Sequence, residues 1–309
     1  MKQALEYYYN IDIDNIDEFD NNYHFILNKW DYYFVFFNRS LDELNDIITC
    51  INELKRKGIN CHNIIFNKDN QALTKIGDIN YILLSVYNPN EEYDLIDIIK
   101  LQKKLLLNPN HSKLYRNNWA TLWSEKVDYF EYQIKELGLE KKEVLRTFSY
   151  YIGLAENAIS YVNKTNQSYS QGFNDRISLS HRRIHYPNIK VNYLNPLSFI
   201  FDLEVRDIAE YLKSLFFLSK ELDPLEELQV YLKTAKLSIY SYQMLYARLL
   251  YPSYYFDIYE QIMNKKIDED NLLRIVNKVN LYEQFLKKAY LEISKYANIE
   301  KIDWIINLH

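Results

Sequence analysis

The sequence changes character near residue 88, and this change limits the folds open to it. Before that point, short runs rich in aromatic and β-branched residues predict strands over 23–27, 32–37, 63–66 and 81–86. After the turn-type segment Asn88-Pro89-Asn90, the pattern becomes long and helical with few breakers. We therefore expect an α+β chain with a small sheet-containing part, 1–88, and a mainly helical part, 89–309.

Helix signals are clearest in the first part. Ser40 with Glu43 three residues later forms a capping-box pattern, and Gly58 stands where a helix end is expected. Further helices are predicted in the second part, over 94–107, 113–137 and 141–162 and again from Val205 onward, with Pro224 and Pro252 at helix starts or breaks. Extended segments at 177–180 and 197–201 flank a loop.

Composition excludes several classes of function. The formal charge of −5 gives the whole chain no electrostatic reason to wrap nucleic acid. Only five glycines occur and no two are closer than fifteen residues, so glycine-rich phosphate loops are absent. Cys50 and Cys61 lack metal-ligand spacing, with only His62 nearby. No segment has the length of about 18 apolar residues that spans a bilayer, and no signal peptide is recognisable, so we expect a reduced, intracellular protein.

The loop at 178–190 concentrates unusual chemistry. His181 and His185 lie four residues apart, but they would share one face only in a helix, and Pro187 favours a loop over a zinc site. Arg182 and Arg183 suit a phosphate or carboxylate, or one of them pairs with a structural acid such as Asp207.

This loop resembles the H-G-D-x-H-x-x-N catalytic loop of aminoglycoside phosphotransferases and choline kinases. His181, His185 and Asn188 match, whereas Arg182 and Arg183 replace the glycine and the aspartate. The segments 119–123 (WATLW), 152–162 (IGLAENAISYV), 206–212 (RDIAEYL) and 246–252 (YARLLYP) resemble spore-coat kinase-like proteins of the CotS and YutH type. The resemblance implies a two-lobed protein-kinase-like fold, other spore-coat proteins as partners, and assembly from the mother-cell cytoplasm into the coat.

The resemblance also assigns roles, most of which this chain does not fill. Arg183 stands at the catalytic aspartate, so no catalytic residue is expected in the degraded loop. The strand lysine aligns near Phe37, and Arg39 lies past the strand end. Further roles are implied elsewhere. Asn188 and Asp202 are metal ligands only if the protein is active, and Asp202 otherwise caps the helix near Val205. Asp207 is implied to be a structural acid that bonds back to the His181 loop. Without the strand lysine, Glu43 or Glu53 is expected to be a solvated surface charge.

Three functions remain open at this point. The first is a non-catalytic kinase-fold protein with a structural or binding role in endospore formation, without cofactor or nucleic-acid partner. The second is a Mg-ATP-dependent small-molecule phosphotransferase, in which Asn188 and Asp202 hold magnesium and Asp175 replaces the base. The third, disfavoured by the net charge, is an anion or nucleic-acid contact at 181–190.

Overall fold

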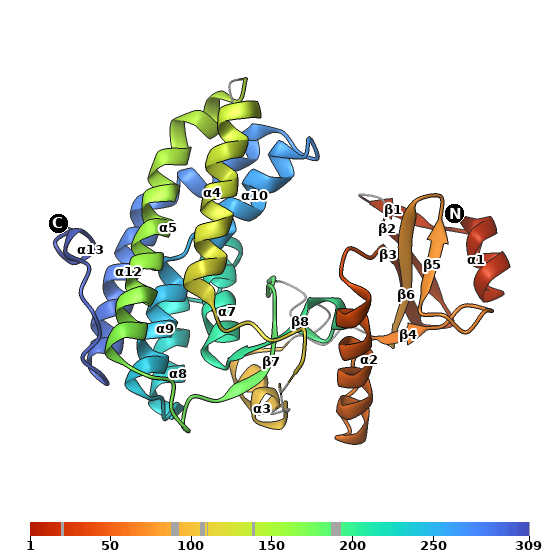
Figure 1. Cartoon of the computed structure of the whole chain (residues 1–309), viewed down its shortest axis with the longest axis horizontal. Helices are drawn as coiled ribbons and strands as arrows, with labels where there is room; N and C mark the ends of the chain where they lie inside the picture. Colours follow the sequence, from red (N-terminus) through yellow and green to blue (C-terminus); the bar gives the residue numbers. More distant parts are fainter. Residues whose placement is uncertain are drawn as a thin grey trace. The chain divides into compact units, whose positions relative to one another are not determined.

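A computed structural model describes residues 1–19, 22–87, 93–105, 109, 111–137, 140–186 and 193–308. The chain divides into two compact units (Figure 1). The first unit contains Met1–Tyr93, Asn108–Tyr115 and Asn188–Ile200, and the second contains Asp94–Leu107, Arg116–Pro187 and Phe201–His309. Each unit is described by itself below.

The first unit is built on an antiparallel sheet. Its strands are β1 (Asp17–Phe19), β2 (Asn22–Leu27), β3 (Trp30–Phe36), β4 (Asn63–Ile65), β5 (Leu73–Ile76) and β6 (Ile79–Tyr87). The order is β1-β2-β3-β6-β4, and β5 also pairs with β6. Gly77 has a φ of 61° in the turn between β5 and β6, a conformation that glycine adopts without strain. The predicted strands are present, whereas β1 and β5 were not predicted.

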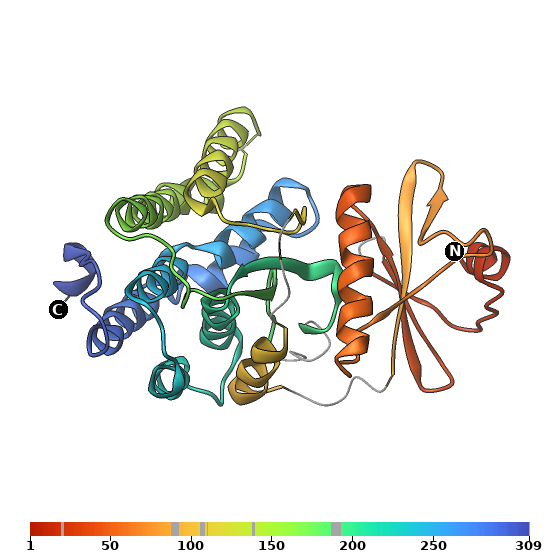
Figure 2. The same ribbon diagram turned by 60° about the horizontal axis from the view of Figure 1, so that its bottom comes forward.

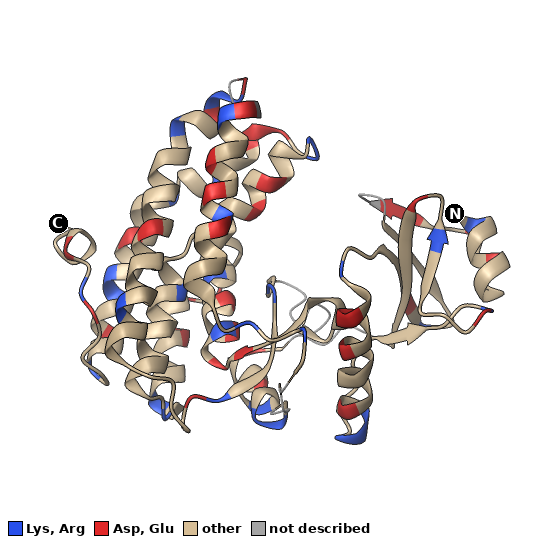
Figure 3. Ribbon diagram, in the orientation of Figure 1, with Lys and Arg blue, Asp and Glu red and all other residues tan. Residues whose placement is uncertain are grey.

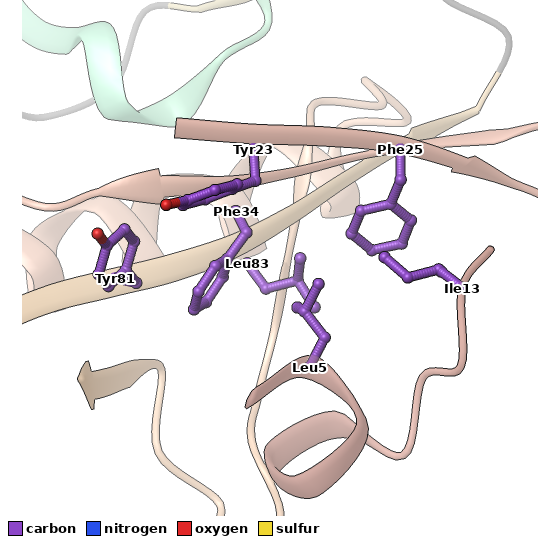
Figure 4. Close-up of a cluster of buried hydrophobic side chains, with 7 residues drawn as sticks. All are labelled: Leu5, Ile13, Tyr23, Phe25, Phe34, Tyr81 and Leu83. Atoms are coloured by element: carbon purple, nitrogen blue, oxygen red, sulfur yellow. The ribbon is translucent and has the colours of Figure 1, made fainter. Parts of the chain in front are cut away.

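Two helices cover opposite faces of this sheet, as Figures 1 and 2 both show. Helix α1 (Lys2–Tyr9) packs on the face that carries Tyr81 and Leu83 (Figure 4); the full cluster is Leu5, Ile13, Tyr23, Phe25, Phe34, Tyr81 and Leu83. On the other face, Ile82 and Leu84 pack in a second cluster with Phe37, Leu44 and Ala72. Alternate residues of β6 therefore serve the two faces, as the period of two in a strand requires.

Helix α2 (Leu41–Arg56) supplies Leu44 to the second cluster. Both hydrogen bonds of the predicted capping box at Ser40 and Glu43 are present. Lys55 and Arg56 occupy the last turn, seen in blue at the lower end of α2 in Figure 3, where they complement the partial negative charge of the helix end.

The second unit is mainly helical. Its helices are α3 (Leu95–Lys104), α4 (Trp119–Leu137), α5 (Lys142–Ser168), α7 (Val205–Leu218), α8 (Pro224–Thr234), α9 (Ile239–Leu250), α10 (Ser253–Met263), α11 (Leu273–Val276), α12 (Val279–Ser294) and α13 (Asp303–Ile306). Short 3₁₀ turns occur at Pro196–Ser198, which belongs to the first unit, and at Glu269–Leu272. Strands β7 (Ile177–His181) and β8 (Phe199–Leu203) pair. Within the described ranges, no helix combines the length and apolarity that crossing a membrane demands.

Two helices form the centre of the second unit. Helix α9 is buried along its length except at Ile239, and α7 is buried from Val205 to Leu215. These helices pack against each other, and α7 also contacts β7. Because α7 carries four charged residues in its buried part, Arg206, Asp207, Glu210 and Lys213, the centre of this unit has to neutralise charges internally.

Candidate functional site

Asp207 fixes the end of β7. One carboxylate oxygen, Oδ1, accepts a hydrogen bond from the backbone N–H of His181 at 2.9 Å. The other, Oδ2, lies 2.8 Å from Nδ1 of the His181 ring. Both residues are completely buried. This is the contact back to the loop that the family resemblance implies for Asp207, and it places residue 183 just beyond the strand end.

Arg183 makes a two-pronged ion pair with Asp257 on α10. Its Nε donates to Oδ2 at 2.6 Å and its Nη2 donates to Oδ1 at 2.8 Å, while Nη1 donates to the carbonyl of Arg182 at 2.7 Å. Glu210 lies 3.8 Å from Nε. Burial by itself lowers the pKa of Arg183, but Asp257 and Glu210 together raise this pKa above its usual value. The predicted partner was an acid such as Asp207; the structure assigns Asp257 instead.

Asp202 lies within β8 and is 1% exposed. Its Oδ2 accepts hydrogen bonds from Arg206 at 3.1 Å and from Arg248 at 2.6 Å, and its Oδ1 accepts one from the backbone N–H of Leu203 at 2.7 Å. The alternative expectation, a cap on the following helix, is wrong, because α7 has Glu204 at its cap position and no capping side-chain hydrogen bond.

The two arginines that hold Asp202 are themselves enclosed. Both guanidinium groups lie 4.5 Å from the ring centre of Trp119, a separation typical of cation–π contacts. Arg206 also donates to the backbone carbonyls of His181 at 2.7 Å and Arg182 at 3.0 Å. Burial and the neighbouring Arg248 lower the pKa of Arg206 to about 10, so it remains a cation at neutral pH.

Glu210 and Lys213 form a further buried pair, with 2.7 Å between Oε1 and Nζ. Lys213 also donates to Oγ of Ser253 at 2.6 Å. Burial raises the pKa of Glu210, but Lys213 and Arg183 outweigh it and lower this pKa to about 2. Glu210 is therefore an anion at neutral pH.

We call these residues the loop charge cluster: His181, Arg183, Asp202, Arg206, Asp207, Glu210, Lys213, Arg248 and Asp257. Each of its four carboxylates contacts a basic side chain, and its arginines and lysine also number four, so apart from His181 their formal charges cancel. Removing one member of such an arrangement leaves a charge without its partner, which is strongly destabilising where that charge is buried.

In the first unit, the position aligned with the kinase lysine is taken by an apolar side chain. Phe37 is 5% exposed and packs in the core. The nearby Arg39 donates from Nη1 to the carbonyls of Leu197 and Phe199, both at 2.9 Å, and from Nη2 to Glu43 at 3.1 Å. Glu43 was expected to be a solvated surface charge, but it pairs with this buried arginine. Glu53 instead pairs with Arg56 at the surface.

The remaining predicted residues lie apart from the cluster or outside the description. Asn188 falls outside the described residues. His185 borders a cavity next to Arg183, and burial lowers the pKa of its ring. Asp175 is buried and accepts hydrogen bonds from Ser241 at 2.6 Å, from the backbone of Gly172 at 2.6 Å and from Ser238. Among the residues described, no three His, Cys, Asp or Glu side chains form a group that could hold a metal ion.

Sequence reasoning missed Asp257, Arg248 and the Glu210–Lys213 pair. The three-residue spacing of Glu210 and Lys213 was a detectable signal, because such residues are neighbours on a helix. Asp257 is 74 residues from Arg183, and no local pattern connects them.

Together, the sheet-plus-helix unit, the helical unit and the histidine-bearing loop define a kinase-like protein of the aminoglycoside phosphotransferase fold. The chain is similar to an aminoglycoside phosphotransferase from Alicyclobacillus acidocaldarius, with a TM-score of 0.60, 11% identity, and coverage of 92% of this chain and 93% of that one. It is also similar to the AMP-bound spectinomycin phosphotransferase APH(9)-Ia, with a TM-score of 0.57, 15% identity, and coverage of 94% and 96%. These likenesses establish the two-lobed kinase-like fold that was expected.

The sequence match is more specific. A model of the family described as spore coat putative kinase YutH matches residues 2–289, and the chain belongs to this family. It is 29% identical over 207 residues to the endospore coat-associated protein YutH of Bacillus subtilis strain 168, a match that covers 60% of this chain and 61% of that protein. The chain thus aligns with about three fifths of the length of this curated relative. The predicted resemblance to the spore-coat kinase-like proteins is confirmed.

Proposed function

We propose that this chain is a non-catalytic kinase-fold protein of the spore coat. It acts as a structural or binding component in endospore formation, has other coat proteins as partners, and passes from the mother-cell cytoplasm into the coat. Membership of the spore coat family and the coat association named for the Bacillus subtilis relative support the setting.

The observation that carries the non-catalytic part is the pairing of every carboxylate in the loop charge cluster with a basic side chain. Phosphoryl transfer needs a free loop carboxylate to orient the attacking hydroxyl and acidic or amide oxygens to hold magnesium. Arg183 stands where the resemblance expects the loop carboxylate that orients the hydroxyl, and it donates two hydrogen bonds to Asp257.

Asp202, as arranged, does not fit a magnesium ion. Magnesium is bound through one or two carboxylates in an octahedral shell of oxygens. The oxygens of Asp202 are engaged by Arg206, Arg248 and a backbone N–H, and two guanidinium groups repel a third cation at that place.

The described residues that the phosphotransferase alternative needs are already engaged in other contacts. Asp175, the candidate substitute base, is occupied by Ser238, Ser241 and the backbone of Gly172. In the first unit, Arg39 is held by Glu43 and two backbone carbonyls and does not replace the strand lysine.

Labelled ATP tests the non-catalytic part. The full chain is incubated with magnesium or manganese, ATP and a panel of amino alcohols, sugars and extracted coat proteins, beside an active aminoglycoside phosphotransferase. We expect no phosphate transfer above the protein-free blank. Transfer that is abolished in Asp175→Asn, the candidate base, and retained in the exposed-site control Asp303→Asn would show a working enzyme.

Coat fractionation tests the structural part. A tagged copy of the chain, expressed in the mother cell of a sporulating host, is expected in the detergent-resistant coat fraction and in cross-linked products with coat proteins. Recovery only in the mother-cell lysate, at a stage when the coat is assembled, contradicts a coat role.

A further inference from the structure

A cavity of about 250 Å³ lies in the second unit next to Arg183. Residues 183–185, helices α7 and α10, and helix α11 enclose it. One part of its wall is apolar and is formed by Ile184, Phe217, Leu218, Tyr254, Ile258 and Ile275. Apolar walls with a few polar groups are typical of small-molecule sites, which measure about 300–1,000 Å³ for drug-sized ligands. A cavity of this size takes a smaller molecule.

The cavity lining contains three basic and two acidic side chains. Arg183 pairs with Asp257, and Lys213 pairs with Glu210, so four of the five are already neutralised. The fifth, Arg274 on α11, is exposed, and no acidic side chain in the described part of the chain pairs with it. The lining thus has one positive charge in excess.

The histidine at the cavity does not alter this balance. Burial is the main influence on His185 and lowers the pKa of its ring, so it adds no positive charge at neutral pH. The excess charge therefore belongs to Arg274, whose guanidinium group presents a fork of N–H donors that matches a carboxylate.

We propose that this cavity binds a small organic carboxylate with an apolar body. The carboxylate pairs with Arg274, and the body contacts the apolar wall around Phe217 and Ile275. An amine finds no free anion here, because Glu210 and Asp257 are held by Lys213 and Arg183. A nucleotide carries more negative charge than the single excess cation offsets. The inference goes beyond the proposed function, because neither a coat role nor the lack of phosphate transfer requires a ligand.

Three probes of one skeleton test the charge preference. The full chain is titrated with 3-phenylpropionate, 3-phenylpropanamide and 3-phenylpropylamine, without nucleotide, and binding is followed by calorimetry and ligand-detected NMR. We expect saturable binding of the carboxylate, binding of the amide weaker by about tenfold or more, and no binding of the amine. Equal affinity for the amide, preference for the amine, or no saturation by the carboxylate at millimolar concentration overturns the proposal.

Two exposed positions locate the site without threatening the fold. Arg274→Gln is expected to weaken 3-phenylpropionate binding about tenfold. Leu218→Glu, which adds a carboxylate at a wall residue 46% exposed, is expected to weaken it as well. The control Arg146→Gln removes an arginine on α5 whose side chain is 57% exposed and lies outside the cavity. An equal loss in the control would assign the binding to general surface charge and contradict the proposal. Since no nucleotide is present, failure here leaves the non-catalytic proposal unaffected.

Discussion

Arg183 changes what its loop can do, because a guanidinium group accepts no proton and repels a metal cation. Its two hydrogen bonds to Asp257, at 2.6 and 2.8 Å, join the loop to α10. The side chains of Arg183 and Asp257 are 27% and 29% exposed, so the pair is partly shielded from water. We therefore expect the Arg183–Asp257 pair to contribute to the free energy of unfolding.

A double-mutant cycle measures the strength of that pair. Arg183→Ala and Asp257→Ala each lower stability, and the double variant loses less than their sum, with a coupling of about 1–2 kcal/mol. Lys126 and Glu260 provide the control, since they form a 3.1 Å pair that also involves α10 but have side chains 34% and 38% exposed. Their coupling is expected to be about 0.5 kcal/mol. Urea unfolding of the wild type, the four single variants and the two double variants measures both couplings. Equal coupling in the two cycles counts against a special role for Arg183.

Asp202 gives the sharper distinction between structure and catalysis. Asp202→Asn leaves Arg206 and Arg248 buried without their counter-charge, and we expect a loss of about 3–5 kcal/mol in the free energy of unfolding. Asp303→Asn, at a side chain 80% exposed, is expected to change it by less than about 0.5 kcal/mol. A carboxylate kept free for a metal behaves differently, because its replacement commonly stabilises the fold. Thermal melts that place Asp202→Asn at or above the wild type contradict the pairing.

Among the elements, α2 shows what sequence patterns predict, and β1, β5 and α4 show what they miss. The capping pattern at Ser40 and the glycine at position 58 identified the two ends of α2, because both signals are local. β1 and β5, of three and four residues, are too short for a recognisable alternation. α4 begins at Trp119, six residues later than predicted, after a segment in which His111 has a φ of 64°.

The candidate site was predictable to the same limited extent. The loop motif placed Arg183 after a strand, as in the structure, because strand and motif are adjacent in sequence, whereas His181 is the last residue of β7. The choice of Asp257 as the partner of Arg183 depends on how α10 packs within the second unit, and α10 shares no sequence pattern with the loop. Asp202 was expected directly after the extended segment 197–201, but it lies inside β8, which extends through Leu203.

The cap of α2 provides a prediction at this scale. Ser40→Ala removes the acceptor for the Glu43 N–H and is expected to cost about 1 kcal/mol in helix stability. Thr49→Ala serves as the control, because Thr49 lies within the same helix, is exposed and bonds only to a preceding carbonyl. Amide exchange in the first turn of α2 should accelerate about fivefold in Ser40→Ala and stay near wild type in Thr49→Ala. Similar exchange in the two variants contradicts the capping role.

As a whole molecule, the chain consists of two compact units. The first has apolar clusters on its sheet, and the second has a centre of buried helices. Because each unit has its own core, the two can unfold in separate transitions. The second unit buries every residue of the loop charge cluster except Arg183 and Asp257, and its stability therefore depends on the protonation of the buried groups.

The stability of the second unit is expected to fall in acid. The pKa of Glu210 is about 2 in the folded state, below its usual value of 4.5, because of Lys213 and Arg183. Between these values the unfolded chain binds more protons, so the stability that Glu210 confers above about pH 4.5 is lost as the pH falls toward 2. Glu210→Gln should be less stable at pH 7 by an amount on the order of a few kcal/mol and should converge with the wild type in acid. Urea midpoints between pH 7 and 2.5 that run parallel for the two proteins contradict this.

Calorimetric titration of the full chain with Mg-ATP tests most directly whether the paired carboxylates exclude nucleotide and metal. We expect no saturable heat and no magnesium-dependent change in the melting temperature. Saturable, magnesium-dependent binding contradicts the account; it would stabilise the protein by about 2.7 kcal/mol at a hundred times its dissociation constant.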